Sequence, residues 1–599
     1  MIYHCEDHTC NYWDEGEKLP ERCPQCGRKL LRANEADMTG DDWTALGNTL
    51  WDAEASDKKR MVDCFRKAAY LGSAWGVCNL GICMEQGNGV EADPVQAFWL
   101  YQQAVEMGSL NAVCCLGVCY QYGIGTAPDA EKAAELYCKA AEYGSPRGQM
   151  LLARAFHDGI GVEADAAEAV HWVRAAAYQR YGEGMYRLGV CYEYGDGVEQ
   201  NWEHAVHWFR EAAESGVSVA MAVLGYCYEK GCGVEQSWEQ AFSWYRRGAE
   251  CGDLRSMHNL GYCYEKGCGV EQSWEQAFSW YRRGAECGYP VSMGNLGWCY
   301  KKGYGVEQNW QEAIKWYEQG AQCGDLQSMH NLACCYERGE GVEQNEDRAL
   351  YWYRRGAEAG SDYCMYCLGW NYSNGEGVEQ NMTEAIRWYT AAAEGGNADA
   401  MHDLGWHYDH GEGVEQDMKK AICWYERAAE QNHPAAMNSL GECYAMGRGV
   451  PRDLETAMEW YRRAAELGEA MADYNMGWHL EQAGKLSEAY AHYRKAADGN
   501  DDSAWWALGR FYENGVVVAQ DGKEARRCYE TGEKLGSVKC KMRLARCKLL
   551  GIGGRRAKKA GLDLCRQALE LAKESSEKED YGYEAEMNLL RRTIAENES

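Results

Sequence analysis

The sequence predicts an all-α fold, an α-solenoid of about 15 stacked helix pairs, and two observations carry this prediction. The stretch GYCYEKGCGVEQSWEQAFSWYRRGAECG occupies residues 225–252 and occurs again, unchanged, at 261–288. A leucine followed by Gly or Ala recurs every 36 residues from Leu80 to Leu440. A protein built of stacked parts simply lengthens when one part is copied, whereas an enzyme with one active site gains nothing from such a copy.

The marker leucine counts the repeats. The series begins at Leu46 and ends at Leu544, with Met476 in the marker position of one repeat. Leu508 follows Met476 after only 32 residues, because the segment HLEQAGKLSEA lacks the usual GxGVEQ insertion. These positions define 15 repeats, each named here by its marker residue.

Each repeat is expected to form two helices, an A helix that carries the marker and a B helix after it. In the Leu260 repeat, small and apolar residues follow helical spacing at Met257, Leu260, Gly261 and Tyr264, and again at Ala277, Trp280, Tyr281 and Gly284. The glycines of the intervening KGCGVEQ segment break the helix and can adopt positive φ. No segment alternates with period two, so strands are not expected outside the N-terminus. One pair cannot bury its apolar face alone, and stacking on the next pair buries it.

Residues 1–35 lie outside the repeats and contain two cysteine pairs, Cys5 with Cys10 and Cys23 with Cys26. Cys23-x2-Cys26 followed by Gly27 is a knuckle that directs two thiolates to one metal ion, and four thiolates suit tetrahedral Zn²⁺. The segment resembles a rubredoxin-like zinc ribbon, although the first pair has x4 spacing and His8 could replace one cysteine. We predict a small zinc ribbon with a structural zinc over 1–35, the solenoid over 36–575 and a C-terminal capping helix over 576–599.

Composition limits the classes of partner and of location. The net charge of −30 disfavours nucleic acid as a partner, because so acidic a protein repels phosphate backbones. No apolar run approaches the ~20 residues of a membrane span, and no basic, apolar signal follows Met1, so a cytoplasmic location is expected. The 30 cysteines are then expected to be reduced, with one column of them, three residues after the marker, acting as small buried apolar side chains.

No recognised catalytic motif appears in the sequence. It has no phosphate-binding loop followed by Lys-Ser/Thr, no HExxH and no GxSxG. His258, His330 and His402 share a column, but each lies two repeats from the next, too far for a shared metal or a catalytic pair. We therefore predict a protein that is not an enzyme.

The repeat NLGYCYEKGCGVEQSWEQAFSWYRRGAECG resembles the Sel1-like repeat, a relative of the tetratricopeptide repeat. The resemblance rests on Leu-Gly-x-x-Tyr in the A helix, the Gly-x-Gly-Val turn and Ala-x-x-Trp-Tyr in the B helix, and it covers roughly residues 40–570. It implies a right-handed superhelix and a role in assembling protein complexes, without naming the complex.

Three columns on the outer side of the A helices form a candidate partner site in the concave groove that the resemblance implies. The aromatic column contains Tyr226, Tyr262, Trp298, Trp370 and Trp406, the asparagine column Asn259, Asn295 and Asn331, and the basic column Lys266, Lys302 and Arg338. Asparagine can pair with a peptide backbone, aromatics supply rigid contact area, and cations attract carboxylates. If the asparagines face the groove, replacing them should leave thermal stability nearly unchanged. The alternative is that the aromatics pack between repeats and the lysines are merely solvated.

These observations predict a non-enzymatic scaffold or adaptor that binds a protein or an extended peptide, with no nucleic acid, membrane or small-molecule substrate as partner. A regulatory subunit of a larger assembly is a second hypothesis and differs only in the partner. A third hypothesis is a hydrolase or antibiotic-binding enzyme, an activity to which some proteins with such repeats have been linked.

Overall fold

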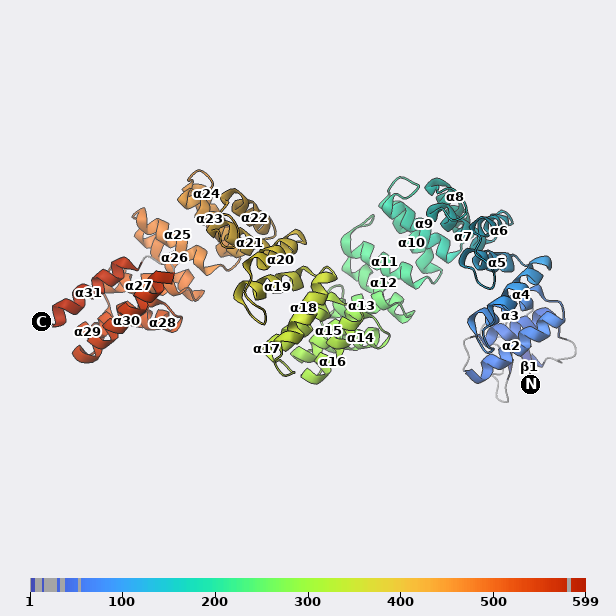
Figure 1. Ribbon diagram of the computed structural model, residues 1–599, viewed down its shortest axis with the longest axis horizontal. Coiled ribbons are helices and arrows are strands. Elements are labelled where there is room, and N and C mark those ends of the chain that lie inside the picture. Colours follow the sequence, from blue (N-terminus) through green and yellow to red (C-terminus); the bar gives the residue numbers. More distant parts are fainter. Residues whose placement is uncertain are drawn as a thin grey trace. The chain divides into compact units, whose positions relative to one another are not determined.

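The computed structural model describes residues 2–5, 13–15, 30–32, 38–51, 55–578 and 583–598, with side chains for 38–51, 57–573 and 583–597. Within these residues, three short strands are followed by 31 helices (Figure 1). Packing divides the chain into two compact halves, residues 1–309 and 310–599.

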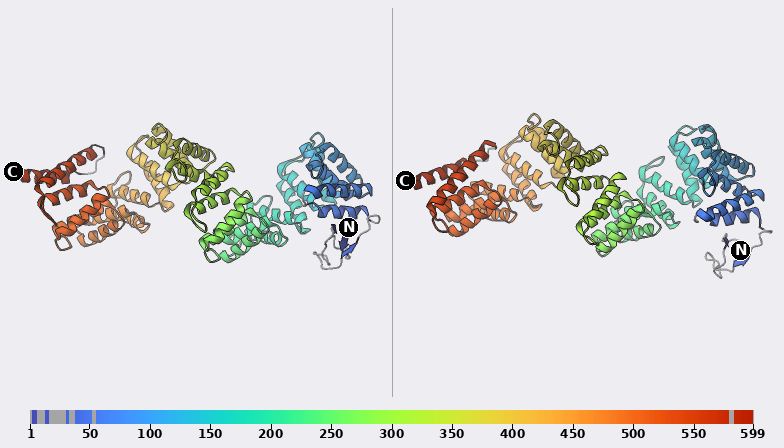
Figure 2. Two further views of the ribbon diagram at one scale, coloured as in Figure 1. Left: turned by 90° about the horizontal axis from the view of Figure 1, so that it is seen from below. Right: turned by 60° about the horizontal axis from the view of Figure 1, so that its bottom comes forward.

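The strands lie at the N-terminus, where the sequence allowed them, and none follows in the rest of the described chain. β1 (Ile2–Cys5) pairs antiparallel with β2 (Trp13–Glu15) on one side and β3 (Leu30–Arg32) on the other. β2 contacts the first helix, and Figure 2 shows the strands beside the first helices. His8, Cys10, Cys23 and Cys26 lie outside the described residues, as does the side chain of Cys5, so the zinc site stays a prediction.

The helices form 15 A/B pairs and one further helix, which confirms the predicted α-solenoid. The A helices are α1 (Gly40–Thr49), α3 (Ala74–Gln86), α5 (Leu110–Tyr122), α7 (Pro146–Asp158), α9 (Gly182–Tyr194), α11 (Ser218–Lys230), α13 (Leu254–Lys266), α15 (Pro290–Lys302), α17 (Leu326–Arg338), α19 (Asp362–Asn374), α21 (Ala398–His410), α23 (Pro434–Met446), α25 (Ala470–Gln482), α27 (Asp502–Asn514) and α29 (Val538–Leu550). The B helices are α2 (Ala55–Tyr70), α4 (Pro94–Glu106), α6 (Ala130–Glu142), α8 (Ala166–Tyr178), α10 (Trp202–Glu214), α12 (Trp238–Glu250), α14 (Trp274–Glu286), α16 (Trp310–Gln322), α18 (Glu346–Glu358), α20 (Met382–Glu394), α22 (Met418–Glu430), α24 (Leu454–Glu466), α26 (Leu486–Asp498), α28 (Gly522–Lys534) and α30 (Lys558–Lys578).

The last helix, α31 (Glu584–Glu598), lies within the segment predicted as a C-terminal cap. It packs against α29 and α30. Arg543 of α29 pairs with Glu586 of α31 at 2.6 Å, and Trp506 of α27 donates to the same carboxylate at 3.2 Å. The terminal repeat is thus covered by a helix that presents a polar outer side to solvent, as the end of a repeat stack requires.

A segment of the GxGVEQ type ends the A helix in most repeats and seats it on the preceding repeat. Gly267 has φ 73° and donates its N–H to the carbonyl of Cys263, a left-handed cap that favours glycine. Gly269 has φ 69°, and a Cβ at this position would overlap the carbonyl of Trp238 in the preceding B helix. Gln272 donates its side-chain amide to the carbonyl of Glu265 at 2.7 Å, which satisfies another orphan acceptor of the helix end.

The core of most repeats contains a contact between the A-helix glycine after the marker and a ring of the B helix. A Cβ on Gly261 would lie only 2.6 Å from the ring of Tyr281, so glycine is needed for the ring to fit. Leu260 and Tyr281 are both fully buried, and burial of such a side chain contributes about 2 kcal/mol. The corresponding ring is fully or almost fully buried along the stack: Tyr101, Tyr137, Phe209, Tyr245, Tyr281, Tyr317, Tyr353, Tyr389, Tyr425, Tyr461, Tyr493 and Tyr529.

A second contact joins each B helix to the A helix of the next repeat through a pair of small residues. A Cβ on Gly148 would lie 2.5 Å from the Cβ of Ala140. At a later interface the smaller residue is on the B helix instead: Gly356 of α18 faces the larger Cys364 of α19. Ala392 and Ala400, both fully buried, take these two positions in the next repeat. When one member of the pair is larger, the other is smaller, so the two helix backbones can approach closely.

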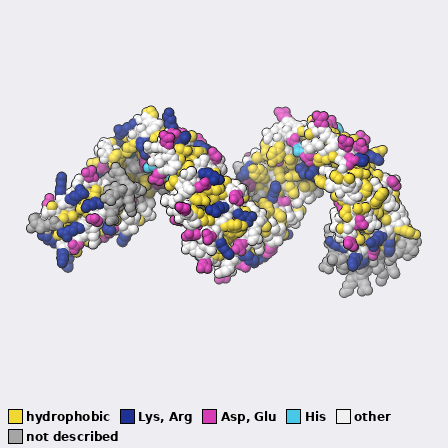
Figure 3. Space-filling model, viewed as in Figure 1, with side chains coloured by type: hydrophobic (Ala, Val, Ile, Leu, Met, Phe, Trp, Pro, Cys, Tyr) yellow, Lys and Arg dark blue, Asp and Glu magenta, His cyan; other side chains and the backbone are white. Residues whose placement is uncertain are grey.

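The surface mixes both signs of charge with exposed apolar side chains. In the face shown in Figure 3, acidic and basic side chains alternate over the helices and apolar side chains lie between them. None of the helices in the described part of the chain combines the length and apolar character needed to cross a membrane.

Candidate interaction surface

The A helices of neighbouring repeats lie next to each other within each half, and their outer sides form a continuous face. α5 contacts α7 in the first half, and α27 contacts α29 in the second. Side chains also bridge neighbouring repeats on this side: Asn79 of α3 donates to Asn48 of α1 at 2.8 Å, and Arg448, in the turn after α23, pairs with Asp409 of α21 at 2.9 Å. We call this the A-helix face, and it carries all the predicted partner-binding residues.

The aromatic column remains accessible on this face. The exposed fractions are 45% for Tyr226, 38% for Tyr262, 39% for Trp370 and 37% for Trp406. Trp298 differs, because it packs against the rings of Trp274 (5.7 Å between centroids) and Tyr304 (4.9 Å). One member of the column therefore packs between repeats, while the other four present ring surface to solvent.

Two members of the asparagine column are hydrogen-bonded to the B helix of the preceding repeat. Tyr245 donates its hydroxyl to Glu229 at 2.8 Å, and the amide of Asn259 bonds the same hydroxyl. Tyr281 donates to Glu265 at 2.8 Å and is bonded by Asn295 in the same way. Burial raises the pKa of both tyrosines, so their hydroxyls are neutral donors at any ordinary pH.

These hydrogen bonds change the expectation that the asparagines can be replaced without loss of stability. A lost hydrogen bond to a buried hydroxyl costs about 1 kcal/mol, so Asn259 and Asn295 have a structural role. Asn331 differs, since it accepts a hydrogen bond from Gln327 at 3.2 Å on its own helix.

The basic column is only partly available to a partner. Lys266 pairs with Glu265 at 2.8 Å and lies 5.9 Å from the centroid of the Tyr262 ring. The hydrogen bond to Glu265 raises the pKa of Lys266. Lys302 and Arg338 are exposed at the corresponding ends of α15 and α17. The charge of Lys266 is thus already compensated within its own helix.

Comparison with known proteins places the chain in a family. The family model for the Sel1 repeat matches thirteen segments, at residues 76–109, 112–145, 146–181, 182–217, 218–253, 254–289, 290–325, 326–361, 362–397, 398–433, 434–469, 470–501 and 504–537. The chain belongs to the Sel1 repeat family. Proteins of this family generally mediate protein–protein interactions and are typically non-catalytic.

Two solved structures of Sel1 type show the same likeness. A protective antigen of uropathogenic Escherichia coli strains, which displays an SLR fold, is 32% identical over 75% of this chain and 97% of its own, with a TM-score of 0.52. A Sel1 repeat protein from Oxalobacter formigenes is 30% identical over 41% of this chain and 96% of its own, with a TM-score of 0.38. A search of curated proteins found no significant match.

Several buried titratable groups of the Sel1 repeats are held neutral by their surroundings. His258 packs between the rings of Tyr281 and Tyr289, and burial lowers its pKa to about 4. Burial raises the pKa of Cys227, Cys263 and Cys299 to about 12, so these thiols are neutral packing groups. In the part of the chain with described side chains, no three His, Cys, Asp or Glu residues are placed to hold a metal ion.

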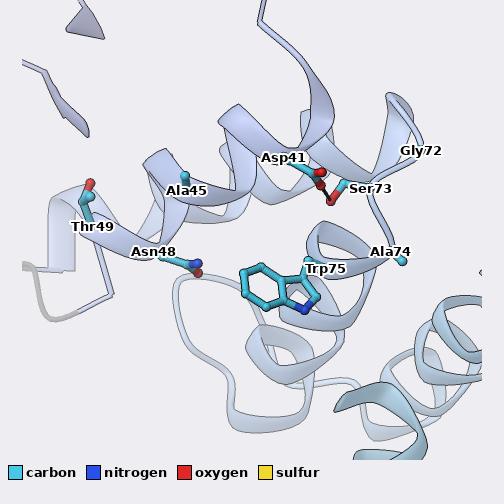
Figure 4. Close-up of a pocket in the computed structure, with 8 residues that line it drawn as sticks. All are labelled: Asp41, Ala45, Asn48, Thr49, Gly72, Ser73, Ala74 and Trp75. Carbon is cyan, nitrogen blue, oxygen red and sulfur yellow. Dashed lines mark hydrogen bonds between the residues drawn. The ribbon is translucent and has the colours of Figure 1, made fainter. Parts of the chain in front are cut away.

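The A-helix face is hollowed at its N-terminal end (Figure 4). A cavity of about 740 Å³ lies between α1 and α3 and is lined by Asp41, Ala45, Asn48, Thr49, Gly72, Ser73, Ala74 and Trp75. The carboxylate of Asp41 already accepts a hydrogen bond from Ser73 at 2.7 Å. The hollow therefore offers ring surface from Trp75, the amide of Asn48 and the carboxylate of Asp41.

Sequence reasoning missed the Tyr–Glu–Asn hydrogen bonds that join successive repeats. A signal was present, because tyrosine at the B-helix position and glutamate five residues after the marker both recur with the 36-residue period. Their meeting depends on how one helix is turned against the next, which the period alone does not specify.

Proposed function

We propose that this Sel1 repeat protein is a cytoplasmic, non-enzymatic scaffold or adaptor that binds a protein or an extended peptide on its A-helix face. The observation that carries the proposal is the accessible aromatic column. Tyr226 and Tyr262 in the first half, and Trp370 and Trp406 in the second, keep more than a third of their surface exposed. Aromatic side chains supply much of the binding energy at protein interfaces, at low entropic cost.

The fold does not explain this exposure by itself. Most repeats bury a B-helix ring completely, as Tyr245 and Tyr281 show, so the aromatics of the A-helix face are additional to the core. Lys302 and Arg338 add positive charge to an otherwise acidic protein, which favours carboxylates of a partner close to the aromatic rings. A regulatory subunit would use the same face and differ only in what it binds.

The hydrolase or antibiotic-binding alternative requires a nucleophile or base set apart from the repeat pattern. Among the described residues, the thiol of Cys115 on α5 has its pKa lowered by the hydrogen bond from Cys78 and by Arg147, but this thiol is buried. We therefore retain the binding function, which is also the general function of Sel1 repeat proteins.

Site-specific photo-crosslinking in the native host tests the proposal. A photoreactive phenylalanine at Trp370 should crosslink a partner protein, whereas the same residue at Tyr351, a 52% exposed aromatic on α18, should not. Substitution of Trp406 by Ala should weaken the crosslink from position 370. Equal crosslinking from positions 370 and 351 would move the interaction surface away from the A-helix face.

We also propose that Cys5, Cys10, Cys23 and Cys26 hold one structural zinc ion. The support is the spacing of the two cysteine pairs in a segment with almost no apolar core of its own. His8 remains the alternative fourth ligand.

A further inference from the structure

A cavity of about 560 Å³ opens between α7, α8 and α9, in the Leu152 repeat of the first half. It lies outside the repeats that carry the predicted partner columns, and its cause can be read from the sequence. Val173 of α8 occupies the B-helix position that holds a buried ring in the neighbouring repeats, Tyr137 before it and Phe209 after it.

The facing A-helix position has changed as well. Ala153 replaces the glycine that makes room for the ring in most repeats, such as Gly117, whose Cβ would lie 2.5 Å from Tyr137, although Ala333 faces the buried Tyr353 in the Leu332 repeat. An alanine methyl and a valine fill much less space than a phenol ring. Ala153 and Val173 both line the cavity, together with Val170 and Val190, so its floor is apolar.

The rim of the cavity is charged. Arg154 pairs with Asp158 at 3.3 Å, and His157 lies between Asp158 (2.7 Å) and Asp196 (3.2 Å). These four groups largely compensate one another. In six repeats the position of His157 carries a glutamate that accepts the tyrosine hydroxyl, as Glu229 does, so the Leu152 repeat lacks both the ring and this acceptor.

Two arginines of the rim remain without a carboxylate partner in the part of the chain that the structure describes. Arg147 donates to Asn111 at 2.7 Å and to the sulfur of Cys115 at 3.5 Å. Arg187 is exposed on α9 and has no carboxylate within ion-pair distance among the described residues, and Glu183 is the remaining acidic group of the lining. Arg147 and Arg187 therefore stand above an apolar floor, in a lining whose three arginines and three carboxylates balance apart from His157.

We propose that this cavity binds a ring-sized apolar group that carries a carboxylate. The ring enters the space that a B-helix tyrosine fills elsewhere, and the carboxylate meets Arg187 and Arg147. Cavities of this size with an apolar lining and a few polar groups are typical ligand sites, and a guanidinium binds a carboxylate through a planar fork of N–H donors. The site does not depend on the partner face proposed above.

Titration of the full-length protein with 3-phenylpropionate tests the proposal. We expect a Kd on the order of 1 mM, the affinity that a fragment of this size typically reaches. Because the carboxylate is part of the recognised group, 3-phenylpropionamide should bind at least fivefold more weakly. Equal binding of the acid and the amide would overturn the proposal. The absence of binding at a ligand concentration of about 10 mM, tenfold above the expected Kd, would also overturn it.

The sequences of the other repeats suggest a variant that should fill the cavity. Ala153→Gly with Val173→Tyr restores the Gly/Tyr pair of the other repeats, so this double variant should fold and lose binding. Arg187→Gln should weaken the acid at least fivefold and leave the amide unchanged, while Arg246→Gln, on the distant and exposed part of α12, should change neither. Unchanged binding in a folded double variant would overturn the proposal. If the double variant does not fold, the comparison of Arg187→Gln with the wild type tests the proposal instead.

The same titration separates two sources of the ligand. The peptide acetyl-Gly-Gly-Gly-Phe presents the same ring and carboxylate at a chain terminus. Tighter binding of this peptide than of 3-phenylpropionate would identify a polypeptide end as the natural ligand, and equal or weaker binding would identify a free aromatic acid. Loss of partner crosslinking in the Trp406→Ala variant concerns the other surface, so the two proposals fail independently.

Discussion

The contact between Gly356 of α18 and Cys364 of α19 shows how neighbouring repeats are matched. Replacing Gly356 by Ala would add a methyl group that overlaps the Sγ of Cys364, lies 3.1 Å from its Cβ and 3.6 Å from the Cβ of Met329. Cys364 is fully buried, so its side chain has no solvent-facing position to adopt. The Gly356→Ala variant should therefore push the two helices apart.

The expected change in the free energy of unfolding of Gly356→Ala follows from two opposing effects. Overpacking of a filled core costs about 1–3 kcal/mol, and the better helix propensity of Ala over Gly returns up to about 1 kcal/mol. We expect a net destabilisation of about 1–2 kcal/mol. Adding Cys364→Gly removes the overlap and produces the Ala/Gly order already present at Ala140 and Gly148. A coupling free energy of about 1–3 kcal/mol between the two substitutions is expected.

Amide hydrogen exchange of the full-length protein, followed by mass spectrometry, measures this effect locally. Long repeat arrays need not unfold in one step, so a local opening free energy is more informative than one global midpoint. Residues 346–374 occur once in the chain, unlike the duplicated 225–252, so their peptides are unambiguous. Glu358→Ala, an exposed change on the same helix, serves as the control and should remain within about 0.5 kcal/mol of the wild type.

Two results would refute this reasoning. If the amides of α18 and α19 exchange at the wild-type rate in the Gly356→Ala variant, the interface between these two helices adapts without cost. Additive losses in the double variant would show that the small pair does not set the spacing between repeats.

Three further predictions concern the repeat register, a buried histidine and the N-terminus. Deleting residues 225–260 removes one full period and joins equivalent positions, so helical circular dichroism per residue should be retained, whereas deleting 225–242, half a period, should cause aggregation or loss of helix. Burial lowers the pKa of His258 to about 4 from about 6.5 in the unfolded chain. The contribution of the neutral His258 to the stability of the fold is therefore complete above pH 6.5 and is lost as the pH falls towards 4. Over this pH range the melting temperature should fall less in His258→Asn than in the wild type. Freshly purified protein should contain one zinc ion per chain by metal analysis and Cys23→Ser should release it, and a content far below one would exclude the structural zinc.

Much of the fold could be predicted from the sequence because its determinants are local and periodic. The marker leucines, the glycines of GxGVEQ and the two helical faces of the Leu260 repeat all act within one 36-residue period. The structure places Leu260 in the core, gives Gly267 and Gly269 positive φ and forms 15 helix pairs. A pattern repeated this often specifies its elements reliably, since each repeat faces the same local choices.

The candidate surface depended on contacts that only the tertiary structure decided. From the sequence, Asn259 and Lys266 pointed away from the core and could equally well have faced a partner. In the structure, Asn259 hydrogen-bonds the hydroxyl of Tyr245, which lies 14 residues away in the previous repeat, and Lys266 pairs with its neighbour Glu265. A column shows the side of the helix from which a side chain leaves, but not which group of the adjoining helix reaches it.

The cavity at Val173 illustrates the same division. The sequence alone shows valine where the neighbouring repeats have a ring, and a loss of ring volume in a stack can close by helix movement or remain open. In this structure Ala153 fills only part of the vacated space, and a cavity of about 560 Å³ remains open. Sequence determined which side chains each repeat contributes, and the packing of one repeat on the next decided which of those side chains remain free to bind.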